Sequence, residues 1–261
     1  MVNALALYFR YVDVAIRAQL QYRAAFVLKL IGYSIATGVE FLGLWALFAR
    51  FGTLGGWTLR EVALIYGVAD VGFALADGLG RGLDRFGDLL KAGEFDRMLV
   101  RPRSTILQLL GFDFRMLTFG RMAQGIAVLA WAAQFVAWSP SRVGLLALSF
   151  ACTTCLFIGL AVLQATTAFW TIESLEVWNA FTYGGNYASQ YPFDIYTRWL
   201  RAFFTAILPL ALTGYLPARA ILGRDPLDAW HVIAPLAGPL FLIISLGVWR
   251  IGVRHHASTG S

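Results

Sequence analysis

Three carboxylates stand inside long apolar stretches of this sequence. Glu40 lies near the middle of one stretch and Asp70 near the middle of the next, and Asp77 follows Asp70 by seven residues, so the two aspartates share a similar helix face. Ionisable groups at the depth of a bilayer are costly and usually face a cavity or a partner. We therefore predict that the three residues form the polar lining of a path through a membrane or a contact between two membrane subunits. An internal pair that only fixes helix packing is the alternative.

Other reactive side chains indicate little chemistry. Cys152 and Cys155 have the spacing of a redox pair, but they lie within an apolar stretch without the strand-to-helix context of that motif. Packing is the better interpretation of both cysteines. The three histidines form no metal-binding set with carboxylates at helical spacing, so no metal or cofactor is expected in this chain.

The densest charge lies in residues 81–104, where six basic and four acidic residues stand together. A loop that only orients membrane helices needs the basic residues alone. Apolar residues keep helical spacing from Leu83 to Leu90, and Pro102 ends the segment. We predict a short, rigid helix that exposes Phe95 as an aromatic anchor within a charged ring, which a cytosolic partner could grip. An ordinary solvated loop is the alternative.

The aspartates around this segment also allow an enzymatic interpretation. Membrane enzymes that transfer phospho-alcohols from nucleotide-activated donors hold divalent metal with several carboxylates, and Asp77, Asp84 and Asp88 have roughly their spacing. Arg81 and Lys91, however, stand where that motif requires other residues. A metal-dependent transferase is therefore kept only as an alternative, beside a channel or scaffold subunit without catalytic activity.

Helices in a membrane must position all of these residues. Of the 261 residues, 59% are hydrophobic and 14% are charged, whereas a soluble domain carries about 25% charged residues. Apolar stretches of this length close their backbone hydrogen bonds as helices. We predict an all-α integral membrane protein with one domain over residues 1–261. Its six spans lie at about residues 26–48, 61–79, 122–138, 143–169, 203–222 and 232–248.

Residues 1–24 predict an amphipathic helix that lies in the membrane interface. Apolar residues recur every three or four positions from Leu5 to Leu20, and charged residues occupy the other face. Membrane lipid is therefore an expected partner. Nucleic acid is not, because the membrane topology explains the basic residues.

The basic residues predict the orientation, since Lys and Arg near span ends stay in the cytoplasm. With six spans, 16 of the 21 basic residues fall on the side of both termini, Arg198 and Arg201 among them. Both termini and the 81–104 loop are therefore expected in the cytoplasm. A crossing by residues 170–199 would leave 14 on that side and is less favoured. Glu173 and Glu176, near the inner end of the fourth span, would contact a cytosolic partner or line the inner gate there, or be solvated charges.

The run from Gly93 to Pro102, GEFDRMLVRP, resembles the signature of a bacterial branch of the type-two (ABC-2) exporter permeases of ATP-binding-cassette transporters. Later pieces extend the similarity over most of the chain, namely Tyr191-Pro192-Phe193, Leu208-Pro209 and Tyr215-Leu216-Pro217. The resemblance implies a six-span permease of the bacterial cytoplasmic membrane. Such a permease pairs with a second one, identical or related, and with two cytosolic ATPase subunits, and exports its substrate, here expected to be hydrophobic or amphipathic.

The resemblance also makes the loop after the second span the coupling element that sits in a groove of the ATPase. That role carries onto Glu94, Phe95, Asp96, Arg97, Leu99, Arg101 and Pro102. The pattern G-x-x-x-x-G-K-[ST], which holds the phosphates of ATP, is missing, because neither Lys29 nor Lys91 stands in that context. ATP and its magnesium are therefore expected in the partner ATPase.

Overall fold

The computed structural model describes residues 4–171 and 175–256, and within these ranges it contains helices and connections but no strand. The all-α class is thus confirmed for the described chain. In order, the helices are α1 (Ala4–Leu20), α2 (Arg23–Phe51), α3 (Leu59–Asp84), α4 (Phe86–Lys91), α5 (Glu94–Leu99), α6 (Thr105–Phe112), α7 (Thr118–Ala133), α8 (Pro140–Thr167), α9 (Leu175–Ser189), η1 (Phe193–Ile195), α10 (Arg198–Ala202), η2 (Phe203–Ile207), η3 (Ala211–Tyr215), α11 (Leu216–Ile221), α12 (Ala229–Ile233), η4 (Ala234–Leu236) and α13 (Ala237–His255).

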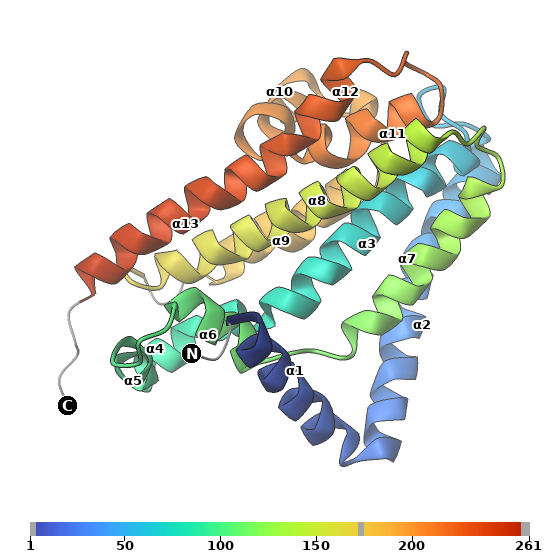
Figure 1. Ribbon diagram of the computed structural model, residues 1–261. Helices are drawn as coiled ribbons and strands as arrows, with labels where there is room; N and C mark the ends of the chain where they lie inside the picture. The colour runs from blue at the N-terminus through green and yellow to red at the C-terminus, as the bar shows by residue number, and fades with distance from the viewer. Residues whose placement is uncertain (1–3, 172–174, 257–261) are drawn as a thin grey trace.

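Helix α3 is the central element, and α7 and α8 pack along it (Figure 1). It is buried over most of its length. Glycines let its neighbours approach closely, as small residues do between membrane helices: a Cβ at Gly82 would stand 1.8 Å from the carbonyl oxygen of Leu109 in α6. Helix α13 packs against α8, while α2 lies at the edge beside α7.

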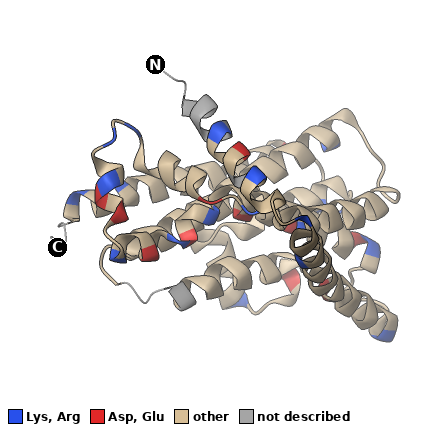
Figure 2. Ribbon diagram, turned by 90° about the horizontal axis from the view of Figure 1, so that it is seen from below, with Lys and Arg blue, Asp and Glu red and all other residues tan. Residues whose placement is uncertain are grey.

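Among the described residues, four helical runs are long and apolar enough to cross a membrane. They are Arg23–Phe51, Leu59–Lys91, Pro140–Thr167 and Ala229–His255, which match the first, second, fourth and sixth predicted spans. The third predicted span corresponds to α7, whose 16 residues fall short of the roughly 20 that a straight crossing takes. Charged residues gather at the end of the bundle near the C-terminus, and long stretches without charged residues make up most of the other helices (Figure 2).

The fifth predicted span, over residues 203–222, is not one continuous helix. Two helical runs, Arg198–Ile207 and Ala211–Ile221, meet there at an angle of 84°. Pro209 causes the break, because its ring disfavours helical geometry at the preceding residue and it has no N–H to donate. Leu208 is accordingly extended, with φ −110° and ψ 94°. The chain therefore enters the bundle and turns back.

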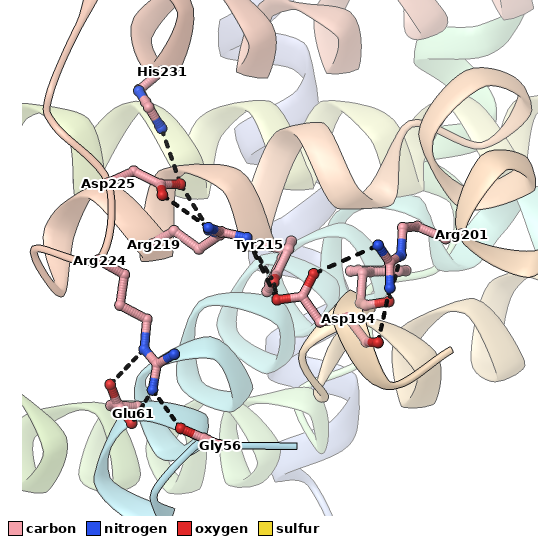
Figure 3. A network of polar contacts seen from close by, with 10 residues as sticks. Gly56, Glu61, Asp194, Arg201, Tyr215, Arg219, Arg224, Asp225 and His231 are labelled. Carbon is pink, nitrogen blue, oxygen red and sulfur yellow. Dashed lines mark hydrogen bonds and ion pairs between the residues drawn. The ribbon is translucent and has the colours of Figure 1, made fainter. Parts of the chain in front are cut away.

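The placement of Arg201 at the same end as the 81–104 loop is also wrong. Arg201 lies 3.8 Å from Asp194, and Asp194 lies 3.4 Å from Arg219, beside the loop where Arg224 binds Glu61 (Figure 3). Glu61 is in the first turn of α3, whereas the 81–104 loop begins near its other end, about 30 Å along the helix. Helix α9 runs back along α3 and α8, which carries residues 190–201 to the Glu61 end.

Helix α1 occupies the segment where the N-terminal helix was expected, and it packs against α6. The side-chain amide of Gln19 donates to the carbonyl of Phe114 and accepts from the backbone N–H of Met116 at 3.1 Å. These bonds tie the end of α1 to the connection that precedes α7.

Candidate functional site

The 81–104 loop folds into two short helices, α4 and α5, joined at Gly93. Gly93 has φ +67°, a left-handed conformation that glycine adopts without steric cost. Phe95 is only 1% exposed. The prediction that Phe95 projects as an exposed anchor is therefore wrong.

Phe95 instead belongs to an aromatic cluster formed by Phe86, Phe95, Phe169 and Trp249. Its ring centroid lies 5.0 Å from that of Phe86, 5.6 Å from that of Phe169 and 6.1 Å from that of Trp249, all edge to face. Edge-to-face contact is a preferred arrangement of aromatic rings. The cluster fixes the loop to the ends of α8 and α13.

The exposed part of α5 lies on its other side and continues past its end. Val100 is 84% exposed and Leu99 is 40% exposed, between the exposed arginines Arg97 and Arg101. We call Arg97, Leu99, Val100, Arg101 and Pro102 the coupling surface, after the role that the resemblance implies for this loop. It presents apolar side chains within a basic rim.

The two carboxylates of α5, those of Glu94 and Asp96, are only partly exposed. Glu94 is half-buried, and Asp96 Oδ1 lies 3.0 Å from Nε2 of His256 at the end of α13. Of the residues to which the resemblance gives a coupling role, Phe95 and Asp96 thus hold the loop in place, Glu94 is half-buried, and the others form its surface.

A charged triad joins three helices near the middle of the bundle. Arg121 of α7 donates from Nε to Asp70 Oδ1 at 2.6 Å and from a terminal nitrogen to Glu40 Oε2 at 2.9 Å. The side chains of Asp70 and Arg121 are almost fully buried, and Glu40 is partly exposed. The hydroxyl of Tyr187 in α9 donates to the second oxygen of Glu40 at 3.0 Å. The two carboxylates thus share one arginine.

Arg121, the cation of this triad, is a residue that the sequence analysis did not single out. A signal was present: two intramembrane carboxylates require a cation, and Arg121 is the basic residue at the start of the next apolar stretch. Gln124, one turn later, donates to the carbonyl of Thr37 and to the hydroxyl of Tyr66. The polar contacts therefore cross α2, α3 and α7 at one level.

Asp77 lies on the same face of α3, closer to the coupling surface. It is 3.9 Å from Arg81, which pairs more closely, at 2.7 Å, with Asp84. Asp77 and Asp84 line a small cavity between α3, α8 and α9, together with the rings of Phe73 and Tyr183. Asp70, Asp77 and Asp84 recur every seven residues, so this polar face runs from mid-helix to the loop.

Two further expectations find less support in the geometry. Glu173 lies outside the described residues, and Glu176 is in the first turn of α9, where its side chain is not described. Asp88 is exposed on α4 rather than turned to the cavity of Asp77 and Asp84. Over the described ranges, no three histidine, cysteine or acidic side chains converge as metal ligands would.

The opposite end of α3 carries a second charged network (Figure 3). Arg224 Nε lies 2.6 Å from Glu61 Oε1, and its guanidinium stacks 3.8 Å from the ring of Trp57. Arg219 pairs with Asp225 at 2.7 Å, and its hydrogen bonds lower the pKa of that carboxyl. These contacts fasten the returning chain after α11 to the start of α3.

Comparison with known proteins identifies the family to which the chain belongs. The family model described as "ABC-2 family transporter protein" matches residues 34–260. No curated protein and no solved structure matches the chain. The match covers most of the sequence, including the triad, the coupling surface and the charged network, and confirms the resemblance seen in the loop. The chain therefore belongs to the ABC-2 family of transporter proteins, as a multi-pass membrane component that is not itself catalytic.

Proposed function

We propose that this chain is the permease of an ATP-driven exporter, and that a separate cytosolic ATPase docks on the coupling surface. The observation that carries the proposal is the exposure of Val100 and Leu99 between two arginines at one end of the bundle. Exposed apolar side chains ringed by charge are typical of protein contacts. ATP and magnesium belong to the ATPase in this scheme.

The chemistry of the coupling surface specifies its partner. Arg97 and Arg101 are exposed, while the nearest carboxylate, Asp96, is engaged with His256. The ATPase groove is therefore expected to combine an apolar pocket for Val100 with acidic side chains at its rim.

The substrate path follows the polar face of α3 in this proposal. Asp77 and Asp84 line a cavity on that face, and Glu40 remains partly exposed between α2 and α9. Apolar side chains such as Ile31, Ile35 and Trp45 cover the outward side of α2. A second permease, identical or related, would close the path against this side. We place the coupling surface and both termini in the cytoplasm of a bacterium, with a hydrophobic or amphipathic substrate moving outward.

The test is co-purification with the ATPase of the native complex. Val100→Asp and Arg101→Glu should each weaken ATPase binding by at least about 30-fold, the effect of losing a 2 kcal/mol hot spot. Arg250→Glu is the matched control, because Arg250 is exposed at the same end, on α13 outside the coupling surface. If both coupling variants retain the ATPase as well as Arg250→Glu does, the docking proposal fails.

A further inference from the structure

An apolar cavity of about 230 Å³ opens between α1, α3 and α7, on a different face of α3 from Asp77. Its walls include Val12 of α1, Leu75 and Gly78 of α3, and Met122 of α7. Gly78 stands six residues before the last residue of α3, about 9 Å along the helix. The cavity therefore lies within the half of the bundle that ends at the 81–104 loop.

The lining of the cavity is unsuited to water. Its one polar side chain is that of Thr118, whose hydroxyl already donates to the carbonyl of Arg115 at 2.7 Å. A buried water needs two to four polar partners, whereas apolar cavities of about 150 Å³ stay dry and bind molecules such as benzene. A void costs stability in proportion to its volume. In a bilayer the abundant apolar molecule that could fill it is a lipid chain.

The charge of α1 and of the start of α2 indicates which lipid. Helix α1, which forms one wall, carries Arg10 and Arg17, and α2 begins with Arg23 and Lys29. Asp13, the single acidic residue between positions 4 and 29, pairs with Arg17 at 2.9 Å. Arg10, Arg23 and Lys29 are exposed. Basic groups at a membrane surface attract anionic head groups.

We infer that this cavity binds one acyl chain of an anionic phospholipid from the leaflet on the side of the 81–104 loop. The chain fills the space between α1 and α3, and the head group lies among the basic residues of α1 and early α2. The bound lipid thus holds α1 against the bundle. The inference rests on the membrane location of the chain and not on the docking of an ATPase.

The test uses the full-length protein in phosphatidylcholine vesicles that contain a trace of phosphatidylglycerol with a photoreactive acyl chain. After irradiation, labelling at Phe119 and Met122 should exceed labelling at Leu240, which is exposed on α13. Leu75→Trp and Val12→Trp fill the cavity from two walls. Each should reduce the labelling of α7 about tenfold, which corresponds to about 1.4 kcal/mol of binding. Two walls are used because either substitution alone could disturb folding.

Leu240→Trp is the matched control, since it adds the same side chain to an exposed position of α13 and should leave α7 labelling unchanged. Labelling that is uniform over α7 and α13, or that survives both filling variants, would overturn the site. Equal labelling by a photoreactive phosphatidylcholine with the same chain would overturn the anionic head group.

Discussion

Phe95→Ala is expected to release the coupling surface from the bundle without unfolding the rest of the bundle. The Phe95 ring contacts Phe86, Phe169 and Trp249, and also His256 at a centroid distance of 5.2 Å. This cluster is separate from the larger apolar core between α3, α7 and α8. The substitution should therefore act locally on α4 and α5.

The magnitude follows from the burial of the ring. Truncating a buried phenylalanine to alanine costs about 3–5 kcal/mol, through the lost transfer energy and the cavity that remains. Phe95 is 1% exposed and its neighbours are rings, which leave little room for collapse. If the substitution destabilises the closed form of α5 by 3 kcal/mol, the open form becomes roughly 150-fold more populated.

Hydrogen exchange measures that population, because amide protection reports local opening. Amides of Glu94–Leu99 should exchange about two orders of magnitude faster in Phe95→Ala, while those of α3 keep their rates. Val100→Ala is the control, since Val100 is 84% exposed and surface changes usually fall within about 0.5 kcal/mol. Unchanged exchange of α5 in Phe95→Ala would refute the role given to the aromatic cluster.

The other predictions concern the triad, a helix contact and the distal network. Arg121→Ala leaves the buried Asp70 without its cation and should cost about 3–5 kcal/mol, measured as a lower thermal midpoint in detergent; a midpoint like that of the unmodified protein would contradict the triad. Gly82→Ala should destabilise the fold by about 1–3 kcal/mol, because its Cβ would overlap the carbonyl of Leu109. Gly87→Ala is the neutral control in the same assay, because a Cβ there would meet no atom within 4 Å. Hydrogen bonds from Arg219 lower the pKa of Asp225 below 3.8, so the ionised carboxyl stabilises the fold above that pH and the contribution is lost as the pH falls through the lowered value. The thermal midpoints of Asp225→Asn and the unmodified protein should accordingly differ at pH 7 and converge in acid, and a difference that persists in acid would contradict this.

The sequence predicted the long helices because lipid leaves an apolar stretch no other way to satisfy its backbone. The sequence did not predict the 84° bend at Pro209, because the composition of residues 203–222 also suits a straight span. Proline is tolerated within membrane helices, so its presence alone does not distinguish a kink from a reversal. The predicted location of Arg201 was wrong for the same reason, because a reversal of the chain changes the end of the bundle at which the flanking residues lie.

The coupling loop shows a different limit of sequence reasoning. Phe95 and Met98 are spaced by three residues and form the buried face of α5, whereas Leu99 and Val100 are exposed. A helix of six residues is too short for periodicity to separate its two apolar sides. Only the rings of Phe169 and Trp249, far away in the chain, decide which side is covered. Arg121 was missed for the same reason, because its partners Glu40 and Asp70 lie on other helices.

The unequal attachment of the helices bears on how movement could pass through the permease. Helix α3 is buried between α7 and α8 and is fastened at its start by the Glu61–Arg224 pair. Helix α2 is largely exposed and reaches α3 through Glu40, which shares Arg121 with Asp70, and through the edge-to-face contact of Phe41 with Tyr66. Tightly interlocked helices resist relative displacement, whereas a charge pair can re-form in a second geometry. We therefore expect α2 to move against a rigid body of α3, α8 and α13, with the triad as the contact that changes.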